Sequence, residues 1–516
     1  MIATLHKTNK LIAYEQAPAV FGELRRQGQR IVQCHGTFDL VHPGHIIHLE
    51  EAKTHGDVLV ITLTAEPHVN KGPGRPYFND TMRVKSLAAL ECVDFVVVVP
   101  FPAAVEAIEC VSPDIYCKGT EYKDMNNDPT GNIADDVATV HRVGGRIEYV
   151  GSVVYSSSKL LNNNFSVISD RVKAYCKELS AKYTPSQFRD AVESFAKLKV
   201  LLIGDAIFDR YTFVNVQGLT TKNRTLSSRF HDEDTQCGGA LAVYKHLKEF
   251  SHNVDIISLV GNEPWVDAAI RSNVAPEDDH ILRAADFRTT VKQRFVEESN
   301  RSKELTKLFA VNYIHEATPD ARTASQLFDK VAKMITSYDL VLITDFGHGL
   351  MQQPLRELVQ EKADYLGLNC QTNSNNHGFN IINRQYRKAD CFSVDEQEML
   401  LACGLRDPDF KQELAAIKSA FQAQYCWLTR GAKYTLGLNG VAAATAPSLQ
   451  KNVTDTIGAG DALFSVVTLA ARSGIPIDLS TFIGQLAGAQ AVDTIGNTQP
   501  VNKTKLIKGG MALLNY

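Results

Sequence analysis

The chain lacks the features that mark several classes of protein. None of its ten cysteines is spaced as C-x-x-C, which argues against a zinc or thiol-redox site and favours reduced thiols in a cytoplasmic protein. No apolar run approaches about 18 residues, and residues 1–20 lack the apolar core of a signal peptide, so we expect no membrane partner. With a net charge of −4, the chain has no overall excess of the basic residues with which proteins bind nucleic acid.

A G-x-x-x-x-G-K-[ST] string is also missing, which excludes a P-loop nucleotide site. The composition that remains, with 44% apolar and 22% charged residues, is typical of a globular protein. A chain of 516 residues is too long for one ordinary core, so we expect two or three domains.

The first part of the chain alternates between strand-like and helix-like runs. Apolar runs at 29–34, 58–63, 93–99 and 147–150 are interleaved with helical patterns at 46–53 and 81–90. This alternation predicts a parallel sheet covered on both faces. Residues 167–182 and 185–197 are charged and amphipathic and predict linker helices. We therefore expect a domain at 1–165, a helical linker at 166–197 and a second domain at 198–516.

The second domain repeats the α/β pattern. Strand-like runs at 200–203, 254–259, 340–344, 365–369 and 425–428 predict another α/β sheet. Two stretches that alternate between polar and apolar residues, 211–230 and 289–311, instead predict antiparallel strands. They would form a small sheet standing off the main one, with an exposed edge.

A phosphate-handling signature occupies residues 36–45, Gly-Thr-Phe-Asp-Leu-Val-His-Pro-Gly-His, between a predicted strand and a predicted helix. Ligands bind at this position in open α/β sheets. Gly44 would let a phosphate approach the backbone, and His42 and His45 could stabilise charge on an α-phosphate while pyrophosphate leaves. A metal site or structural histidines would explain an isolated H-x-x-H, but the preceding Phe38 and Asp39 favour the phosphate interpretation.

A second such signature lies at 455–461, Asp-Thr-Ile-Gly-Ala-Gly-Asp, directly before the apolar helical run 462–471. Glycines allow backbone N–H groups to crowd around phosphate oxygens, and the helix presents its positive end to them. Asp461 could accept a proton from an attacking hydroxyl. A plain helix-capping turn is the alternative.

The N-terminal segment resembles the nucleotidyltransferase superfamily that includes glycerol-phosphate cytidylyltransferases and the transferase half of ADP-heptose synthases. Besides residues 36–45, the resemblance rests on Lys71-Gly-Pro-Gly-Arg-Pro, an arginine in the helix at 81–90, Lys118-Gly-Thr-Glu-Tyr and a serine cluster. It implies a Rossmann-like fold, with His42, His45 and Lys71 in catalysis. It also implies nucleotide-binding roles for Thr37, Phe38, Gly44, Arg83, Lys118, Ser156, Ser157 and Ser158.

Residues 198–516 resemble the ribokinase-like sugar kinases, and specifically the kinase half of bifunctional ADP-heptose synthases. The segments that carry this are 204–211, 238–240, 429–431 and 455–461. The resemblance implies an α/β domain with a small β lid, Asp461 as catalytic base, and Mg²⁺ with ATP, and it leaves room for a monovalent cation. The implied sugar ligands are Asp205, Asp209, Gly238, Gly239 and Asn369; the implied ATP ligands are Thr429, Gly431, Gly458, Ala459 and Gly460; the implied metal ligands are Asp395 and Glu398.

Several positions depart from the pattern of the heptose kinases. Asp395-Glu-Gln-Glu replaces their Asn-x-x-Glu, an amide-rich stretch at 369–376 replaces their Asp-Pro-Lys-Gly, and His348 stands where lysine is usual. The stretch at 369–376 is either a surface for sugar hydroxyls or a plain loop. The transferase also precedes the kinase, the reverse of the familiar order.

The resemblance implies a bifunctional enzyme that uses ATP to phosphorylate a sugar phosphate similar to heptose 7-phosphate and then uses a nucleoside triphosphate to make a nucleotide-sugar. ADP-sugar is the expected product, and a CDP-sugar or CDP-polyol is the variant. In a different class, one domain would be a non-catalytic nucleotide-binding scaffold, although the retained site residues argue against this. Because the lids of related kinases pair between subunits, we also expect a homodimer.

Overall fold

A computed structural model describes residues 10–70, 75–120, 133–151, 169–298, 305–314, 318–373, 376–450 and 453–515. The chain divides into two compact units, of which unit 1 comprises Met1–Arg189 with Ile507–Tyr516 and unit 2 comprises Asp190–Leu506. The predicted linker region contains two helices, α7 (Asp170–Ser180) and α8 (Pro185–Glu193). No helix in the described ranges is long and apolar enough to cross a bilayer.

Unit 1 is built on a six-stranded sheet in which every pair of neighbouring strands is parallel. Its strands, in spatial order, are β1 (Leu11–Ile12), β4 (Phe95–Val99), β3 (Val58–Thr64), β2 (Ile31–Gly36), β5 (Ile115–Gly119) and β6 (Arg146–Val150). The parallel sheet predicted from the alternating pattern is thus confirmed. Strands β1 and β5 were not predicted, because the first is only two residues long and the second follows a short helix.

Helices cover both faces of this sheet, and the sequence of β3 explains how. All seven residues of β3 are buried, and its side chains alternate between two separate apolar cores. Leu59, Ile61 and Leu63 pack in the core that contains Leu49 of α2, whereas Val58 and Val60 pack with α1 and α4. The helices that follow or precede the strands of this sheet are α1 (Ala17–Arg26), α2 (Pro43–Lys53), α3 (Asp80–Ala88), α4 (Val105–Val111) and α5 (Ile133–Arg142).

Unit 2 contains an eight-stranded main sheet. Its strands, in order, are β10 (Asn253–Ile257), β7 (Lys199–Gly204), β15 (Leu340–Asp345), β16 (Leu366–Cys370), β17 (Cys391–Asp395), β18 (Tyr425–Thr429), β19 (Tyr434–Asn439) and β20 (Ala442–Pro447). The first six run parallel, and β19 is antiparallel to both of its neighbours, β18 and β20. The carboxyl ends of the parallel strands therefore meet at one edge, where such sheets bind ligands.

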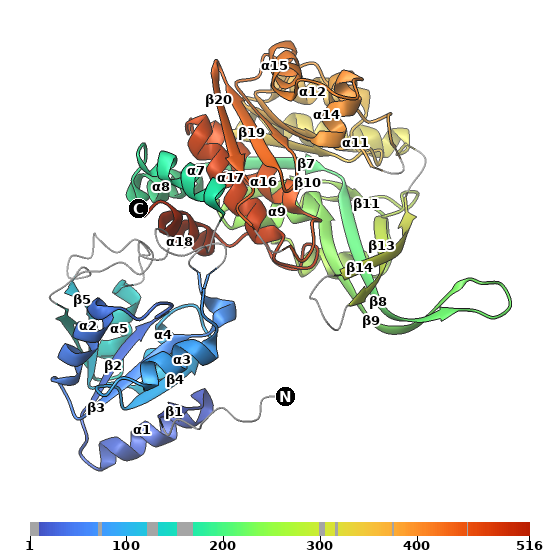
Figure 1. Cartoon of the computed structure of the whole chain (residues 1–516). Helices are drawn as coiled ribbons and strands as arrows, with labels where there is room; N and C mark the ends of the chain where they lie inside the picture. Colours follow the sequence, from blue (N-terminus) through green and yellow to red (C-terminus); the bar gives the residue numbers. More distant parts are fainter. Residues whose placement is uncertain are drawn as a thin grey trace. The chain divides into compact units, whose positions relative to one another are not determined.

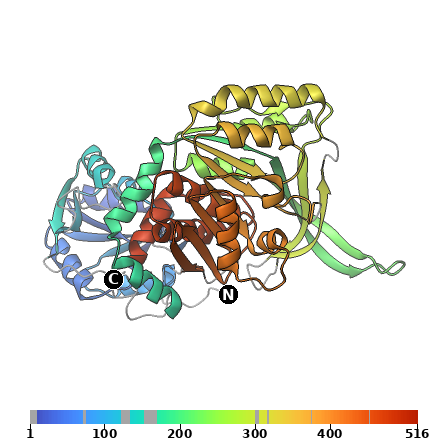
Figure 2. The same ribbon diagram turned by 90° about the horizontal axis from the view of Figure 1, so that it is seen from above.

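Helices also cover both faces of the main sheet (Figures 1 and 2). One face carries α11 (Ala321–Met334), α12 (Gln353–Lys362), α14 (Glu396–Cys403) and α15 (Phe410–Ala420), and the other carries α9 (Ala240–Lys248), α16 (Ala459–Arg472) and α17 (Ile477–Ala491). Helix α16 is buried at every position from Asp461 to Ala471, because α9 and α17 pack beside it and the sheet lies against it. Three further helices are α10 (Val266–Arg271), α13 (Ile382–Gln385) and α18 (Lys503–Leu513).

A separate four-stranded sheet, here called the lid, stands off the main sheet (Figure 1). Its order is β14 (Leu305–Tyr313), β13 (Thr290–Glu298), β8 (Ala206–Leu219) and β9 (Leu226–Gly239). The two hairpins are antiparallel, as predicted, but β8 and β13 join them in a parallel pair that the alternating pattern could not reveal. A further small sheet pairs β11 (Leu259–Val260) with β12 (Leu282–Arg283).

Candidate active sites

The two histidines of the N-terminal signature lie together at the start of α2. His42 is the N-cap residue, and its Nδ1 accepts a hydrogen bond from the backbone N–H of His45 at 3.4 Å. The two imidazoles stack with their centroids 4.0 Å apart, and the ring of Phe38 lies 5.3 Å from that of His45. Gly44, which precedes His45 in the sequence, is also buried. Burial lowers the pKa of His42, so its imidazole is neutral and lies beside the positive end of a helix.

A buried aspartate fixes the loop that leads to these histidines. Asp39 accepts hydrogen bonds from the backbone N–H groups of Tyr77 and Phe78 at 2.8 and 3.0 Å, and it forms an ion pair with Arg75 at 3.2 Å. Both side chains of the ion pair are at most 5% exposed. Phe38 has a φ of 44°, a strained conformation for a side chain of this size. The loop therefore has one conformation held by internal contacts.

Two basic residues predicted to bind nucleotide contact protein atoms. Arg83 is buried, and its Nη1 donates to the backbone oxygen of Thr37 at 2.7 Å while its Nη2 contacts Asp80. Lys118, at the carboxyl end of β5, pairs with the buried Asp136 at 2.8 Å. Arg83 thus supports the signature loop from behind. Lys71, Ser156, Ser157 and Ser158 lie outside the described residues.

In unit 2, the glycine-bracketed turn forms the start of α16. Gly458 is the N-cap with a φ of 83°, and a Cβ added there would lie 2.0 Å from Oδ1 of Asn497. Only glycine fits this position. Ala459 and Gly460 form the first turn, and their backbone N–H groups lie at the positive end of the helix. Asp461 follows in the same turn and is only 9% exposed.

The carboxylate of Asp461 is held by one amide. Nε2 of Gln371 donates to Oδ1 of Asp461 at 2.8 Å and also to Oδ1 of Asn369 at 2.8 Å. Burial raises the pKa of Asp461 to about 6, and the amide of Gln371 opposes that shift. A carboxylate with this pKa is mostly ionised at neutral pH and still basic enough to take a proton.

Asp455, at the other end of the same turn, ties the turn to the lid. It accepts hydrogen bonds from the hydroxyl of Tyr211 at 3.0 Å, from Nζ of Lys307 at 2.8 Å and from the backbone N–H of Gly496 at 3.1 Å. Burial alone would raise the pKa of Asp455, but the hydrogen bond and charge of Lys307, with the hydrogen bonds from Ile457 and Tyr211, together outweigh it and leave that pKa below its ordinary value. Asp455 therefore remains charged and structural.

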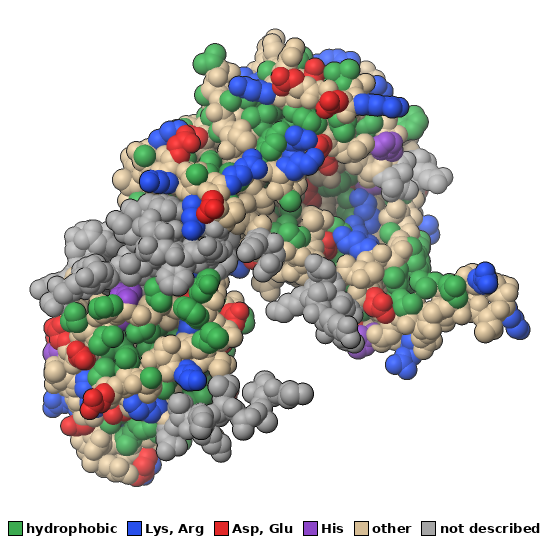
Figure 3. Space-filling model, viewed as in Figure 1, with side chains coloured by type: hydrophobic (Ala, Val, Ile, Leu, Met, Phe, Trp, Pro, Cys, Tyr) green, Lys and Arg blue, Asp and Glu red, His purple; other side chains and the backbone are tan. Residues whose placement is uncertain are grey.

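The predicted sugar ligands lie where the lid joins the body of unit 2. Asp209 on β8 pairs with Arg294 on β13 at 2.5 Å. A Cβ added to Gly238 would lie 2.2 Å from Oδ2 of Asp209, and one added to Gly239 would lie 2.6 Å from the backbone oxygen of Asp205. A side chain at either position would clash with these neighbours, so the packing of the protein itself, and not only the approach of a sugar, requires glycine at both. Lys and Arg side chains gather inside the hollow beside the lid strands (Figure 3).

Asp205 is bound by the loop that follows β15. Its Oδ2 accepts from the backbone N–H groups of Phe346 at 2.9 Å and His348 at 3.4 Å. Burial raises the pKa of Asp205 to about 7, and the charge of Asp345 adds to the shift. Asp205 is therefore partly protonated at neutral pH, whereas the sequence alone would give an ordinary carboxylate.

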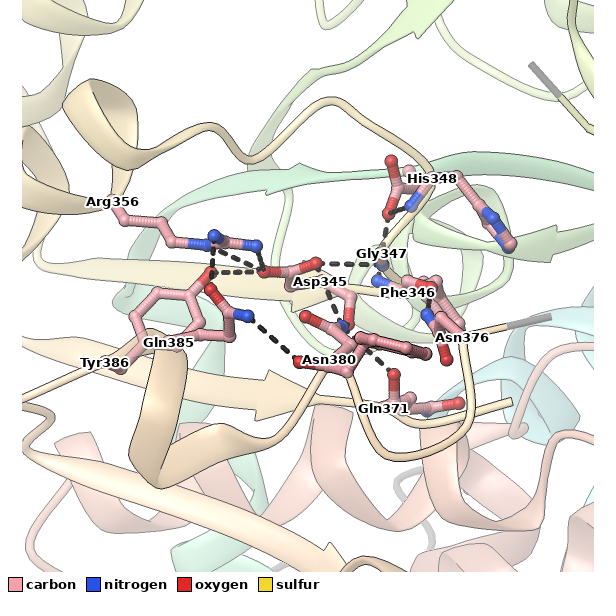
Figure 4. Close-up of polar contacts among 12 residues, drawn as sticks. Asp345, Phe346, Gly347, His348, Arg356, Gln371, Asn376, Asn380, Gln385 and Tyr386 are labelled. Atoms are coloured by element: carbon pink, nitrogen blue, oxygen red, sulfur yellow. Dashed lines mark hydrogen bonds and ion pairs between the residues drawn. The ribbon is translucent and has the colours of Figure 1, made fainter. Parts of the chain in front are cut away.

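Asp345 is the centre of a buried polar network (Figure 4). Its Oδ2 accepts from Nη2 of Arg356 at 2.9 Å and from the hydroxyl of Tyr386 at 2.8 Å, and its Oδ1 accepts from the backbone N–H of Gly347 at 2.9 Å. The side-chain amide of Asn380 donates to the backbone oxygen of Asp345 at 3.1 Å. These contacts fix the loop at the end of β15, beside the predicted sugar ligands.

The described residues of the amide-rich stretch, 369–373 and 376, lie beside the candidate site and pack inward. The side-chain amide of Asn369 lies 3.2 Å from Oγ and from the backbone oxygen of Ser393 on β17. The amides of Asn373 and Asn376 both donate to the backbone oxygen of Phe346, at 2.9 and 2.8 Å. The stretch therefore connects the loop after β15 to the residues around Asp461.

The predicted metal ligands cap a helix. Asp395 is the N-cap of α14, where its Oδ1 accepts from the backbone N–H of Glu398, and Oε2 of Glu398 accepts from the backbone N–H of Asp395. Burial raises the pKa of Glu398 well above its ordinary value, and the charge of Asp395 adds to this. Within the described ranges, no group of three or more His, Cys, Asp or Glu side chains is arranged to hold a metal ion.

The turn after β18 contains the predicted ATP ligands Thr429 and Gly431. Thr429 is the register partner of Asp395 on the neighbouring strand, so both lie at the ligand-binding edge of the sheet. Arg430, between the two, pairs with Glu396 at 2.5 Å and lies 4.1 Å from the ring centroid of Phe410. These contacts hold the turn against the start of α14.

Sequence reasoning missed several residues that the fold brings to this site. Gln371, Arg294 and Lys292 come from strands or loops with no recognisable motif, and only contacts across the fold identify them. The amide-rich composition around Gln371 was the one available signal. All ten cysteines are free thiols, in agreement with the reduced state predicted from their spacing.

Comparison with known families assigns a model to each part of the chain. Residues 34–185 match the cytidylyltransferase-like family, and residues 197–504 match the pfkB family of carbohydrate kinases. The second match covers more than half of the chain.

Curated relatives match the N-terminal part. The bifunctional protein HldE of Azorhizobium caulinodans is 36% identical over 153 residues, which are 29% of this chain and 30% of that protein. HldE of Aliarcobacter butzleri is 36% identical over 150 residues, which are 28% of this chain and 31% of that protein. The chain thus spans less than a third of the length of these relatives, and its two domains stand in the reverse of their usual order.

Solved structures resemble the kinase part. Phosphofructokinase-2 from Escherichia coli, in complex with substrates and products, aligns with 60% of this chain and 97% of its own at 14% identity and a TM-score of 0.48. Arabidopsis thaliana ribokinase, complexed with ribose and ATP, aligns with 62% of this chain and 99% of its own at 14% identity and a TM-score of 0.48.

The raised pKa of Asp205 makes the stability of unit 2 depend on pH. A carboxyl that binds its proton more tightly when folded contributes stability below its unfolded pKa of about 4, and loses that contribution as pH rises through about 7. Asp205→Asn keeps an acceptor for the two N–H groups and removes the charge. We therefore expect wild-type thermal stability to fall from about pH 5 to about pH 8, and the Asp205→Asn variant to fall less.

Tryptophan fluorescence reports this unfolding, because both tryptophans of the chain, Trp265 and Trp427, belong to unit 2. Asp232→Asn, which alters an exposed carboxylate of the lid, is the matched control. An identical pH dependence in wild type and the Asp205→Asn variant would contradict the assignment of this effect to Asp205.

Proposed function

The chain belongs to the pfkB family of carbohydrate kinases, and on this premise we propose that it is a bifunctional enzyme of sugar activation. Unit 2 transfers a phosphoryl group from ATP to the anomeric hydroxyl of a sugar phosphate similar to heptose 7-phosphate. Unit 1 joins a sugar 1-phosphate to a nucleotide and releases pyrophosphate. The observation that carries the proposal is Asp461, a buried carboxylate with a pKa of about 6 at the start of a helix.

In the kinase step, Asp461 accepts the proton of the hydroxyl that attacks the γ-phosphorus of ATP. Gln371 orients the carboxylate through its 2.8 Å hydrogen bond. The N–H groups of the turn at Gly458, Ala459 and Gly460 stabilise the oxygens of the transferred group, since the N–H groups in the first turn of a helix have no partner within the helix ladder. Asp205 and Asp209, with Gly238, Gly239 and Asn369, hold the sugar, and Thr429 and Gly431 contact ATP.

Mg²⁺ is the divalent ion that we assign to this step, bound beside Asp395 and Glu398. The fit comes from the donor set: burial raises the pKa of both carboxyl groups, the charge of Asp395 raises that of Glu398 further, and a cation would stabilise the charged form of both. Mg²⁺ commonly keeps several waters and binds through one or two carboxylates together with substrate phosphates. When bound, it would neutralise charge on the ATP phosphates. A monovalent cation would be a further electrostatic aid to the same turn.

In the transferase step, an oxygen of the sugar 1-phosphate attacks the α-phosphorus of a nucleoside triphosphate and pyrophosphate leaves. His42 and His45 donate hydrogen bonds to the α-phosphate, beside the positive end of α2. Thr37, Phe38 and Gly44 border this position, and Lys71, Lys118 and Ser156–Ser158 complete the proposed nucleotide site. Arg83, predicted from the sequence to bind nucleotide, instead supports the loop through its bond to Thr37. No protein nucleophile takes part.

The expected product is an ADP-sugar. A kinase that starts from heptose 7-phosphate gives a 1,7-bisphosphate, so a separate phosphatase must remove the phosphate at position 7 before the transferase acts. A CDP-sugar or CDP-polyol is the second candidate, because the matched N-terminal family is described as cytidylyltransferase-like. Free cysteines throughout and the use of ATP support a cytoplasmic location.

We further propose that the enzyme is a homodimer assembled through the lid. The lid strands β9 and β14 expose Phe230, Phe309 and Tyr313, which are 61%, 54% and 40% exposed. The rings of Phe295 and Phe309 stack at 4.4 Å on the same sheet. Exposed aromatic side chains on a sheet with free edges favour pairing with a second copy.

The two activities should separate by mutation. Asp461→Asn removes the base and should lower the kinase kcat about 10²–10⁴-fold, leaving pyrophosphate release intact. His45→Ala removes a donor at the α-phosphate and should lower the transferase kcat about 10²–10³-fold, leaving the kinase intact. Each variant is the control for the other.

The measurement is a matrix of sugar phosphates against four nucleoside triphosphates, with mass spectrometry of the products. If the wild type formed neither a phosphorylated sugar nor a nucleotide-sugar across the matrix, a scaffold role would take the place of the proposal. Variants as fast as the wild type would remove Asp461 and His45 from catalysis.

The dimer should dissociate when the lid face becomes charged. Phe309→Lys places a charge among the exposed aromatic side chains and should raise the dimer dissociation constant at least about tenfold. Leu405→Lys, at an apolar residue that is 48% exposed outside the lid, is the matched control. Light scattering at micromolar concentration distinguishes the states, and a wild-type monomer would end the proposal.

A further inference from the structure

The carboxyl end of strand β6 in unit 1 is held by three side chains that have no role in the chemistry described above. The backbone oxygen of Val150 lies 3.2 Å from Nδ1 of His48. The backbone N–H of Gly151 donates to Oε2 of Glu51 at 2.8 Å, and the backbone oxygen of Gly151 accepts from Oγ1 of Thr120 at 2.9 Å. Two of these side chains belong to α2, and the third directly follows β5. We call this group of contacts the clamp.

The contacts of the clamp are directional. A carbonyl oxygen can only accept a hydrogen bond, so Nδ1 of His48 carries a proton in its contact with Val150. The carboxylate of Glu51 accepts from a backbone N–H, and a hydrogen bond to a charged acceptor is stronger than one between neutral groups. Both backbone polar groups of Gly151 and the carbonyl before it are thus bound by side chains.

Gly151 allows the close approach of α2 that the clamp requires. Its φ is 99°, a conformation that a residue with a side chain rarely adopts. A Cβ added there would also lie 3.3 Å from Nδ1 of His48. The ladder between β5 and β6 ends at the register pair Gly119 and Val150. Side chains of the clamp therefore take over where the sheet stops.

Apolar packing alone would not fix the position of α2 this closely. Leu49 and Ala52 bury one face of the helix in the core that it shares with the sheet. Apolar contact is non-directional, so it decides which face of α2 is buried but resists small shifts of the helix along the sheet only weakly. Hydrogen bonds prefer one distance and angle, and those from His48 and Glu51 set the position of the helix against β6.

The position of α2 matters because the same helix carries the two histidines of the signature. His42 is its N-cap and His45 lies in its first turn, three residues before His48. At the other end of the clamp, Thr120 lies two residues after Lys118, which belongs to the proposed nucleotide site. The clamp therefore connects the helix that bears the histidines to the strand end that is assigned to the nucleotide.

We propose that His48 and Glu51 are positioning residues of the transferase. Through Val150 and Gly151 they hold α2 in register with the end of β5, and they thereby place His42 and His45 against the α-phosphate of the nucleotide. Neither residue touches a substrate. This inference rests on the proposed transferase function of unit 1 and adds to it the contacts that keep its site in shape.

Loss of the clamp should slow the transferase. Glu51→Leu removes the acceptor for Gly151 and should lower the kcat of pyrophosphate release about tenfold to a hundredfold, because a shift of about 1 Å in a reacting group can cost that much. Glu51→Gln keeps an acceptor oxygen and should stay within about threefold of the wild type. His48→Phe should act like Glu51→Leu, and His48→Asn, which keeps an N–H donor, should restore most of the rate.

Glu50→Leu is the matched control, since Glu50 is an exposed neighbour on the same helix and lies outside the clamp. It should leave pyrophosphate release within about twofold of the wild type. The kinase activity of unit 2, measured in the same preparations, should be unchanged in every variant and shows that equal amounts of active protein are compared.

A double-mutant cycle with His45→Ala separates positioning from a loss of folded protein. A partly unfolded protein would lose the same factor in either background. If the clamp acts through the histidines, Glu51→Leu should cost much less once His45 is gone, because residues that act as a unit are not additive. We expect the added loss in the His45→Ala background to be about threefold or less.

The possible results distinguish this inference from the proposed function. Wild-type release of pyrophosphate with an equally fast Glu51→Leu variant would overturn the clamp and leave the transferase proposal standing. An equal loss from Glu51→Leu with and without His45 would show that the clamp only stabilises the fold, and it would also overturn the inference. A wild type that releases no pyrophosphate with any sugar 1-phosphate and nucleoside triphosphate would overturn both proposals.

Discussion

The hydrogen bond from Gln371 to Asp461 is the contact on which the kinase site depends. It joins the end of strand β16 to the first turn of α16, two elements that are 90 residues apart in the chain. The same amide group reaches Asn369, and the backbone N–H of Gln371 donates to the backbone oxygen of Asp345 at 2.8 Å. The proposed base, Asp461, is therefore connected through one residue to the Asp345 network.

The network of contacts around Asp345 buries a charge, which costs free energy unless all of the partners of that charge are present. Asp345 is a charge buried at 1% exposure, and such a charge is tolerated only when ion pairs and hydrogen bonds replace its water. Arg356, Tyr386 and the backbone of Gly347 provide them. Burial raises the pKa of Asp205, and the charge of Asp345 raises it further. Hydrogen bonds thus join the loops at the ends of β7, β15 and β16.

Both units place their candidate sites by the same rule, at the carboxyl ends of parallel strands. The sequence predicted the position of a site where its residues lie close together in the chain. His42 and His45 are three residues apart and meet at one helix start, and the glycine at 458 is needed by the turn that precedes Asp461. Short-range patterns of this kind are readable because strand, turn and helix follow one another directly.

Other residues could not have been found in this way. Gln371, Arg356 and Lys292 have ordinary neighbours in the sequence, and only packing across the sheet gives them partners. Asp395 and Glu398 were predicted as metal ligands, yet their spacing also fits the capping box that they form. The parallel pairing of β8 with β13 was equally hidden, because alternation specifies the faces of a strand but not its neighbour.

The pH dependence of the kinase in wild type and in Gln371→Leu tests the central claim most directly. If Gln371 holds Asp461 in its ionised form, kcat/KM of the wild type should fall below about pH 6, where the base becomes protonated. Loss of the amide should move that fall to higher pH, because the hydrogen bond lowers the pKa of Asp461. An acid limb at the same pH in both proteins would contradict the account.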